Sequence, residues 1–474
     1  YLHIGGARTA LFNWLFAKKH NGKLVLRIED TDTERLKEDS VSQILTSLKW
    51  LGLNWDEGPE VGGEVGPYYQ SERREIYSKV AEQLLEEGKA YYCFCTSEIL
   101  EAEREKQRAA KQPFRYARTC RDLPVEEAKA RAAKGEPYSV RIKIPTEGNL
   151  TVHDLIHGDV TFDLTQFDDF VIVKTNGMPT YNFAVVVDDH LMRISHVLRA
   201  EEHLSNTPKQ VLLYEACGFA VPKFGHMPMI LAPDRSKLSK RHGATSVEEF
   251  REQGYLPEAI VNYLTLLGWA PGNEEEIFSL QDTVTQFELE KMSKKAAVYD
   301  TKKLTWMNGQ YLSALPLEAV LPEAKIFFIK SGLVDEAWLE ANKDYFARLV
   351  DVVRVRVKTL QEVVEAAEYF FKEVESYDEK GVGKHFKPEA AELLTVCINA
   401  LEALETFDLA STEAAYNKIA EEQGLSLGKV VHPTRLALTG RTVSPGLFDV
   451  MVLLGKETTL SRMRKAVQYI KALA

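Results

Sequence analysis

Cysteines and long hydrophobic runs are both scarce in this 474-residue sequence. No uninterrupted apolar stretch approaches the roughly 20 residues of a membrane-spanning helix, which excludes a transmembrane protein and leaves no signal segment to interpret. The five cysteines are Cys93, Cys95, Cys120, Cys217 and Cys397, and so small and odd a set argues against a disulfide framework. We therefore expect a cytoplasmic protein with no membrane partner.

An excess of basic residues is also lacking. The chain carries 59 Lys and Arg against 70 Asp and Glu, a formal net charge of −11. This balance excludes a protein that coats nucleic acid indiscriminately, although local basic patches can still contact one structured partner. The composition, 45% hydrophobic and 27% charged, is that of a globular protein. Because 474 residues exceed what one hydrophobic core usually serves, we expect at least two domains.

The first feature that is present is a glycine-containing stretch before a helical pattern. The chain opens with YLHIGG and continues into helical spacing over residues 7–19. A histidine and small residues at the start of a helix can donate hydrogen bonds to phosphate. Taken alone, the stretch fits a helix start with a buried histidine better than a phosphate site. A basic stretch far along the chain, DRSKLSKR over residues 234–241, favours the phosphate site if the fold brings the two together.

A strand-and-helix unit follows. Residues 23–29 are apolar and β-rich in their middle and predict a parallel strand, and apolar residues from Val41 to Leu51 at helical spacing predict the next helix. The polar residues 29–32 lie between them, where ligands bind in open α/β sheets. Thr31, Asp32 and Thr33 fit helix caps at least as well.

The rest of the chain changes pattern twice. Residues 90–180 alternate short β-rich runs with a charged helical segment and a hairpin turn at Asn176-Gly177, which indicates an α+β insertion. Residues 181–245 resume the sheet pattern, with a predicted strand over 227–231 directly before the basic stretch. From residue 246 onward, and above all beyond 311, the spacing is helical. Basic residues predicted to share one helix there fit either a solvated face or an RNA contact; they are Arg348, Arg354, Arg356 and Lys358.

The two phosphate-site candidates resemble the signature motifs of class I aminoacyl-tRNA synthetases. The segment His3-Ile4-Gly5-Gly6 is similar to the family's H-I-G-H, and residues 237–241 (KLSKR) are similar to its K-M-S-K-S. The chain resembles the bacterial glutamyl-tRNA synthetases most closely, through a series of segments in the same order. These are HIGGARTALFN (3–13), RIEDTD (27–32), PTYN (179–182), VVDDH (186–190), HVLRAEEH (196–203) and residues 237–243, followed by a helical carboxyl region.

The resemblance implies a multidomain fold. We expect an α/β Rossmann-type parallel sheet split by an α+β insertion, followed by all-α carboxyl-terminal domains. The two halves of the catalytic domain would be 1–90 and 181–245, with an acceptor-end-binding insertion at 91–180. Residues 246–310 would form a helical stem-contact region and 311–474 an all-helical anticodon-binding domain. The family also uses an Arg and a Ser just before its first motif, so we expect several residues upstream of Tyr1.

The same resemblance implies ATP-dependent ligation of L-glutamate to tRNA(Glu) through a glutamyl-adenylate, with Mg²⁺ accompanying ATP, by a monomer. Attack of a carboxylate on the α-phosphate builds negative charge on the departing pyrophosphate. We expect His3 to donate to phosphate, and Lys237 and Lys240 to neutralise the leaving group, so these three residues would be catalytic. The implied ATP-binding residues are His3, Gly5, Gly6, Lys237, Ser239 and Lys240.

For the amino acid, the resemblance implies that Glu29 receives the α-amino group and that Tyr181 and Arg199 line the side-chain pocket. Arg199 would bind the γ-carboxylate, because a guanidinium group pairs with a carboxylate through two hydrogen bonds and cannot do so equally with an amide. The alternative for Arg199 is a buried structural ion pair with Glu201 or Glu202.

A second segment, Lys291-Met292-Ser293-Lys294, matches the K-M-S-K-S motif more literally than residues 237–241 do. It follows a charged helical run and precedes another helix, whereas the phosphate site requires a loop that follows a strand. We therefore assign the motif to residues 237–241.

Three cysteines resemble the zinc ligands in the inserted domain of some glutamyl-tRNA synthetases. They are Cys93, Cys95 and Cys120, and a tetrahedral site needs a fourth ligand. The sequence offers Asp122 or Tyr116, and relatives without a zinc site are also expected. Zinc is thus one of two alternatives.

Three other functions compete with this interpretation. The usual glutaminyl-tRNA synthetase carries a β-barrel anticodon region, which the helical carboxyl third does not suggest, and the paralogue that glutamylates a modified base lacks that helical region. A nucleotide- or RNA-binding protein could keep the scaffold without catalysis. The presence of Glu29, Arg199, Lys237 and Lys240 favours an active ligase.

Overall fold

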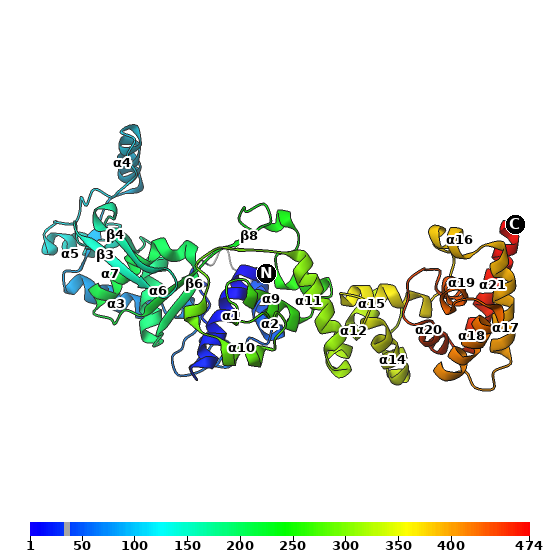
Figure 1. Cartoon of the computed structure of the whole chain (residues 1–474). Helices are drawn as coiled ribbons and strands as arrows, with labels where there is room; N and C mark the ends of the chain where they lie inside the picture. Colours follow the sequence, from blue (N-terminus) through cyan, green and yellow to red (C-terminus); the bar gives the residue numbers. More distant parts are fainter. Residues whose placement is uncertain (33–37) are drawn as a thin grey trace. The chain divides into compact units, whose positions relative to one another are not determined.

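The computed structural model describes residues 1–32 and 38–474. The chain divides into two compact units, coloured along the chain in Figure 1. The first contains Tyr1–Glu249 and Ile260–Asp300, and the second contains Phe250–Ala259 and Thr301–Ala474. Within the described ranges, no helix combines the length and the apolar character needed to cross a membrane.

The strands belong to the first unit. A four-stranded sheet has the order β4-β3-β7-β6, in which β3 and β4 are antiparallel while β7 pairs in parallel with both β3 and β6. A three-stranded antiparallel sheet has the order β1-β2-β5, and β8 pairs with β9 in parallel. The strands are β1 (Ala90–Cys93), β2 (Ser139–Ile142), β3 (Asn149–Asp154), β4 (Gly158–Asp163), β5 (Val171–Val173), β6 (His196–Ala200), β7 (Lys223–Met227), β8 (Ile230–Leu231) and β9 (Ala297–Val298).

The strand order has a consequence for the predicted insertion. The hairpin β3–β4 comes from the segment expected to form the insertion, yet it extends the sheet of β6 and β7, which follow that segment. This arrangement places the end of β3 beside β7, with Asp154 paired to Phe224.

Helices of the first unit begin and end at residues suited to those positions. The side chain of Thr96 accepts a hydrogen bond from the N–H of Ile99 at the start of α4, and Gly218, with φ of 70°, ends α7. The helices are α1 (Ile4–Lys19), α2 (Glu38–Trp50), η1 (Gln70–Glu72), α3 (Arg74–Glu86), α4 (Ser97–Ala109), α5 (Val125–Ala133), η2 (Leu164–Gln166), α6 (Tyr181–Leu191), η3 (Glu201–Asn206), α7 (Thr207–Cys217), η4 (Lys240–His242), α10 (Leu280–Gln286) and η5 (Leu289–Lys291). The chain passes between the units within α8 (Val247–Glu252) and α9 (Pro257–Leu266).

One hydrophobic core joins the strands to helices α3, α6 and α7. Its fully covered side chains include Ile142 and Ile172 of the sheets, Phe183 of α6 and Leu213 of α7. Each large apolar side chain buried in this way contributes about 1.5–3 kcal/mol. The core fixes β6 and α6, the elements that carry Arg199 and Tyr181.

Two predicted strands differ in the structure. The strand expected over 227–231 is wrong: β7 ends at Met227 and β8 begins at Ile230, because Pro228 between them has no N–H to continue a ladder. Residues 23–29 are extended but form isolated parallel bridges, at Val25–Glu57 and Ile28–Tyr69, with two separate partner segments. The basic stretch still follows a strand directly, namely β8.

The second unit is helical, as predicted, and the described part of the chain has no strand after β9. Two hydrophobic cores support it, one through Leu312, Phe328 and Val363 and one through Leu394 and Met463. Its helices are α11 (Thr301–Ala314), α12 (Leu317–Ser331), α13 (Glu336–Ala341), α14 (Lys343–Arg354), α15 (Leu360–Ala367), η6 (Glu368–Phe370), α16 (Glu379–His385), α17 (Pro388–Glu402), α18 (Leu409–Gln423), α19 (Leu427–Thr439), α20 (Leu447–Leu454) and α21 (Lys456–Leu473).

Two details of the helical region differ from the prediction. The strand β9 lies within the segment 246–310 that was predicted to be helical. The basic residues predicted to share a helix do not, because α14 ends at Arg354. Arg354 itself is buried and donates to the carbonyl oxygens of Leu312 and Leu315, at 3.1 and 2.5 Å.

Candidate active site

The motif at His3 lies directly beside residues 245–247, the segment that comes shortly after the motif 237–241. His3 forms an antiparallel bridge with Ser246. The N–H of Ile4 donates to the carbonyl oxygen of Thr245 at 2.8 Å, and the N–H of Val247 donates to that of Leu2 at 2.9 Å. Two segments more than 240 positions apart therefore share one short ladder, and the fold brings both motifs to one place.

His3 caps the first helix. Helix α1 begins at Ile4, earlier than the predicted residue 7, and Nδ1 of His3 accepts a hydrogen bond of 3.0 Å from the N–H of Gly5. In this structure the histidine ring thus occupies the N–H of Gly5, one of the residues that the resemblance assigns to ATP. Burial and the nearby charge of Lys237 lower the pKa of His3. Its ring is therefore neutral at pH 7, with Nε2 as the proton-bearing atom.

The second motif lies on an ordered loop. Leu231 and Lys237 pair in an antiparallel bridge, and Asp234 accepts hydrogen bonds from the hydroxyl and the N–H of Ser236, which lower the pKa of the Asp234 carboxyl to about 2. Ser239 caps η4, where its side chain and that of His242 bond to one another's backbone. In this structure Ser239 serves as a helix cap.

Both lysines of this loop are accessible to solvent. Nζ of Lys237 lies 2.8 Å from a carboxylate oxygen of Glu202, with 69% of the lysine side chain exposed. This contact lowers the pKa of the Glu202 carboxyl. Nζ of Lys240 lies 5.9 Å from the ring centre of Tyr1. Because the Lys237–Glu202 pair is exposed, it is weak, and a polyphosphate can replace Glu202 as the partner of the Lys237 ammonium.

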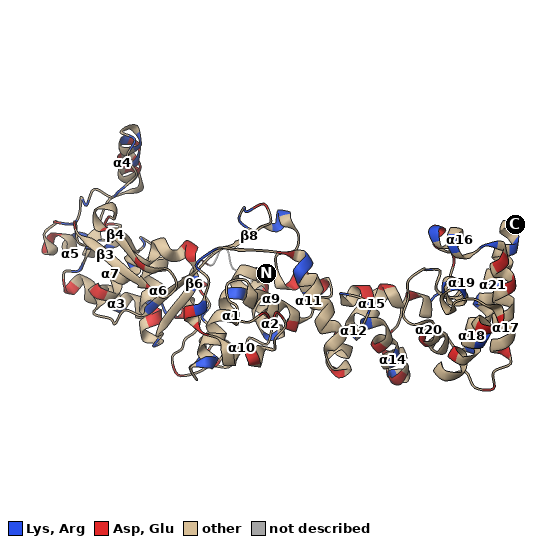
Figure 2. Cartoon of the chain, in the orientation of Figure 1, with Lys and Arg blue, Asp and Glu red and all other residues tan. Residues whose placement is uncertain are grey.

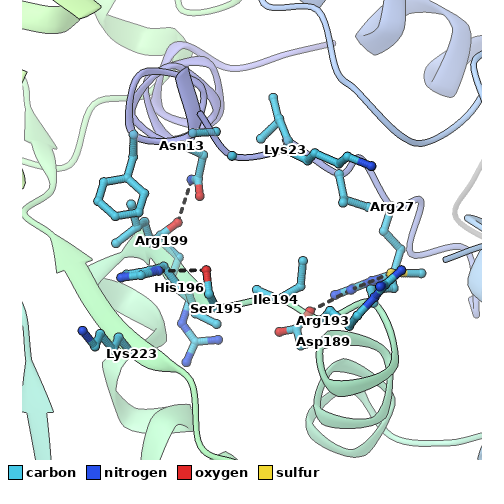
Figure 3. A pocket seen from close by; sticks show the side chains of 18 of the residues that line it. Asn13, Lys23, Arg27, Asp189, Arg193, Ile194, Ser195, His196, Arg199 and Lys223 are labelled. Atoms are coloured by element: carbon cyan, nitrogen blue, oxygen red, sulfur yellow. Dashed lines mark hydrogen bonds and ion pairs between the residues drawn. The ribbon is translucent and has the colours of Figure 1, made fainter. Parts of the chain in front are cut away.

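The three residues predicted to bind glutamate line one cavity of about 1070 Å³, part of whose lining is drawn in Figure 3. Glu29 comes from the extended segment after the first helix, Tyr181 begins α6, and Arg199 lies on β6. Burial and the neighbouring charge of Glu29 raise the pKa of the Tyr181 hydroxyl. The structure therefore gathers side chains that are 170 positions apart in sequence.

Arg27 orients Glu29. Its guanidinium donates to Asp189 at 2.7 Å, and Figure 3 shows these two side chains facing each other. The same guanidinium contacts Glu29 at 3.1 Å. The side chain of Arg27 is only 13% exposed, whereas that of Glu29 is 39% exposed. Arg27 is thus held by buried carboxylates, and Glu29 is the more exposed partner and lines the cavity.

A buried network anchors α6 behind the cavity. Asp188 accepts hydrogen bonds from Arg73 at 2.6 Å, from Tyr77 at 2.7 Å and from Gln70 at 2.9 Å. The side chains of Asp188 and Arg73 are almost completely covered. Since each charge has a partner, the network fixes the helix that carries Tyr181 and Asp189.

Arg199 is buried and bonded to neutral groups. Its Nε donates to Nε2 of His226 at 3.2 Å, and its Nη2 donates to the hydroxyl of Thr207 at 2.9 Å. The alternative ion pairs with the following glutamates do not form among the described contacts, since Glu202 contacts Lys237 and Glu201 accepts from the N–H of Met229. Burial lowers the pKa of Arg199. A buried guanidinium with neutral partners is suited to an anionic ligand.

Sequence reasoning missed the residues that support these groups. Asp154 lies 2.5 Å from Nδ1 of His226, and Nδ2 of Asn13 donates to the carbonyl oxygen of Leu198 at 2.9 Å, which ties α1 to β6. Asn13 belongs to a segment already noted in the sequence. Asp154 and His226 carry no local signal, because the pairing of β3 with β7 brings them together.

The three cysteines form a compact cluster. The sulfur atoms of Cys93, Cys95 and Cys120 all lie within 4.8 Å of one another, and those of Cys95 and Cys120 are 3.8 Å apart. A tetrahedral zinc site with Zn–S bonds of about 2.3 Å has sulfur atoms about 3.8 Å apart. The hydroxyl of Tyr116 lies 3.3 Å from the sulfur of Cys93, whereas Asp122 is exposed and outside the cluster. The three sulfur atoms therefore have the spacing of zinc ligands, and the hydroxyl of Tyr116 is the oxygen beside them.

Residues 291–294, the segment that matches the K-M-S-K-S motif more literally, form part of a packed turn. Met292 is buried, and the N–H of Ser293 donates to the carbonyl oxygen of Gly268 at 2.7 Å. Nζ of Lys291 contacts Glu288 at 3.3 Å. Residues 291–294 precede β9, whereas residues 237–241 follow β8.

Comparisons with known proteins identify the family of this chain. Residues 1–306 match the family described as "tRNA synthetases class I (E and Q), catalytic domain", and residues 318–467 match "Anticodon binding domain". The chain therefore belongs to the class I tRNA synthetases of the E and Q type. Relatives over nearly the whole chain are more specific, and they bear the name glutamate–tRNA ligase.

Two such relatives and one solved structure illustrate the similarity. The glutamate–tRNA ligase of Moorella thermoacetica is 55% identical over 471 residues, 99% of this chain and 96% of that protein. The glutamate–tRNA ligase 2 of Caldicellulosiruptor saccharolyticus is 53% identical over 467 residues, 98% and 96% of the two chains. The crystal structure of a glutamate tRNA ligase from Elizabethkingia meningosepticum, in complex with its amino acid, has a TM-score of 0.89 at 37% identity and covers 99% of this chain and 97% of its own.

Proposed function

We propose that this protein activates L-glutamate with ATP and transfers it to tRNA(Glu). The observation that carries the proposal is the position of two sites on one unit. The motif at His3 and the motif 237–241, which shortly precedes the partner of His3 at Ser246, supply groups for phosphate. The cavity with Glu29, Tyr181 and Arg199 supplies groups for an amino acid with an acidic side chain.

In the first step the α-carboxylate of glutamate attacks the α-phosphate of ATP, which enters as its Mg²⁺ complex. The bond between the α- and β-phosphates breaks, and pyrophosphate leaves with the electron pair. His3, through its Nε2–H, and the N–H of Gly6 at the helix start would donate to phosphate oxygens, and the N–H of Gly5 would join them only if the ring of His3 turned away from it. Lys237 and Lys240 neutralise the charge that develops on pyrophosphate, with Lys237 exchanging Glu202 for phosphate.

Glutamate is selected by charge at both ends. A carboxylate oxygen of Glu29 accepts from the α-ammonium group, and Arg199 pairs with the γ-carboxylate. Glutamine presents an amide with one donor group, which would point an N–H at the guanidinium and leave a buried charge unpaired. This difference disfavours glutamine at the same site.

In the second step the terminal ribose hydroxyl of tRNA attacks the adenylate carbonyl and AMP leaves. We assign the insertion 91–180 to the acceptor end, 246–310 to the stem and the helical region 311–474 to the anticodon, with 1–90 and 181–245 as the two catalytic halves. Helix α4 in the insertion has no buried residue and carries charges of both signs, as Figure 2 shows. Such a helix suits a polar contact with RNA more than a role in a core.

Zinc held by Cys93, Cys95, Cys120 and Tyr116 is the second part of the proposal. The cation would act as a structural link between β1 and the segment 116–120, and it would take no part in glutamate activation. Cys93 and Tyr116 also contact one another in a buried cluster with Phe94 and Tyr91, so the metal would complete a small core.

The proposal is tested by ATP–pyrophosphate exchange with purified protein and tRNA present. We expect exchange with glutamate to exceed that with glutamine by at least about 100-fold in kcat/KM. A preference for glutamine, or exchange with neither amino acid, would contradict it.

A further inference from the structure

Behind Arg199 lies a chain of buried polar groups that the reaction itself does not need. A carboxylate oxygen of Asp154 is 2.5 Å from Nδ1 of His226, and Nε2 of the same ring is 3.2 Å from Nε of Arg199. The hydroxyl of Thr207 lies 3.0 Å from Nε2 and accepts from Nη2 of Arg199 at 2.9 Å. The side chains of Asp154 and His226 are completely covered.

The second oxygen of Asp154 is committed to the backbone. Its Oδ1 accepts from the N–H groups of Ile156 at 2.9 Å, His157 at 2.8 Å and His226 at 3.3 Å. The other oxygen is therefore the one that faces the imidazole. An ionised carboxylate only accepts hydrogen bonds, so the proton of the His226 ring must lie on Nδ1.

This tautomer leaves Nε2 as an acceptor for Arg199. Burial lowers the pKa of His226, and the charge of Arg199 lowers it further. These two effects outweigh that of Asp154, which raises the pKa, so the ring stays neutral. The N–H on Nε and one N–H on Nη2 are occupied, and these two groups form one edge of the guanidinium. The edge made by the two terminal nitrogens is left to a ligand and to the Tyr181 hydroxyl, which interacts with this guanidinium and lines the same cavity.

We propose that Asp154 and His226 are positioning residues, which hold Arg199 by one edge so that its terminal edge pairs with the γ-carboxylate of glutamate. The role rests on the proposed function, because it assumes that Arg199 binds that carboxylate. The ring of Phe224, 5.5 Å from the guanidinium carbon, supports the same orientation. Neither Asp154 nor His226 lines the cavity, so both act through Arg199.

The substitution Asp154→Asn separates orientation from packing. Its amide oxygen can keep the three backbone donors, which turns the NH₂ group toward Nδ1 of His226. That nitrogen must then accept, and the ring proton moves to Nε2, where it opposes the N–H of Arg199. Shape and volume hardly change, whereas the acceptor for Arg199 is lost.

The test compares steady-state kinetics of the wild type, Asp154→Asn and Asp159→Asn. Asp159 pairs with Nδ1 of His153 at 2.6 Å on the exposed surface and is the matched control. We expect Asp154→Asn to raise KM for glutamate at least about 10-fold with kcat and KM for ATP within twofold of wild type, and Asp159→Asn to change none of them. Nitrogen chemical shifts of the imidazole should show His226 protonated on Nδ1 in the wild type and on Nε2 in Asp154→Asn.

A second variant covers the case in which Asp154→Asn fails to fold. His226→Gln can present an oxygen to Nε of Arg199, whereas His226→Leu cannot, so KM for glutamate should rise less in the first than in the second. A wild-type ring protonated on Nε2, or glutamate KM within twofold of wild type in Asp154→Asn, would overturn the positioning role. Failure of the wild type to use glutamate would instead contradict the proposed function, so the two failures are distinguishable.

Discussion

The backbone of His3 is paired with that of Ser246, and this pairing joins the beginning of α1 to the segment just after the lysine-containing loop. Neither segment alone makes a phosphate site. Together they place a neutral histidine, a helix start and two lysines on one unit.

Lys240→Ala should slow glutamate activation about 100-fold or more while tRNA binding changes little, because Lys240 stabilises charge that appears in the transition state. Lys294→Ala, in the other segment that matches the motif, is the control and should change the rate less than threefold. Pyrophosphate exchange and a tRNA binding assay on the same preparations give both quantities. Equal losses in the two variants would place the leaving-group site elsewhere.

Arg199→Lys should raise KM for glutamate about 10- to 100-fold, because an ammonium group cannot pair with a carboxylate through two parallel N–H groups. Arg193→Lys makes the same change at an exposed residue lining the same cavity and should leave KM within threefold. The comparison is made at saturating ATP. Similar KM values in both variants would remove Arg199 from the amino-acid site.

Arg73→Met should lower the stability of the first unit by about 3 kcal/mol, because it leaves the carboxylate of Asp188 buried without its main partner. Arg104→Met removes one partner of an exposed pair with Glu101 and should cause no measurable change. Chemical denaturation followed by circular dichroism measures both. An unchanged unfolding midpoint in Arg73→Met would show that the network contributes little.

The glutamate KM should be constant between pH 8 and 6.5 and should rise below pH 6.5. The pKa of His226 is lowered, so its neutral form persists down through pH 6.5, and protonation at lower pH places a hydrogen on Nε2 opposite Arg199. Asp154, Arg199, His157 and His203 are the titratable groups that interact with this ring. The ATP KM measured in the same buffers is the control, and a rise in glutamate KM already between pH 8 and 7 would contradict the account.

Purified protein should contain about one zinc per chain, and Cys93→Ser should abolish it. Tyr116→Phe should weaken zinc retention against a chelator, because the ring stays while the fourth ligand is lost. Cys217→Ser changes a cysteine outside the cluster and should retain the metal. Elemental analysis of the four proteins decides the matter, and metal-free wild type would exclude the site.

The parts of the site that the sequence could predict are those with a local pattern. His3 before a helix, the lysines after a strand, and Arg199 in an apolar strand each stand in a recognisable context. The fold class, which the structure confirms, and the assignment of Glu29, Tyr181 and Arg199 to glutamate both come from the resemblance to the glutamyl-tRNA synthetases, and that assignment stays a prediction.

The supporting groups could not be predicted, because they depend on tertiary pairing. Asp154 and His226 meet through a single residue pair between β3 and β7, and nothing in the spacing of 72 residues reports it. The occupation of the Gly5 N–H by His3 is likewise a matter of one side-chain rotation. Pro228 was visible in the sequence, and its missing N–H could have divided the strand predicted over 227–231.

The most direct test of the central claim is aminoacylation of purified tRNA(Glu) with labelled glutamate and, in parallel, labelled glutamine. The account predicts ATP-dependent formation of glutamyl-tRNA with little glutaminyl-tRNA. Formation of glutaminyl-tRNA in excess, or no charging with glutamate, would contradict it.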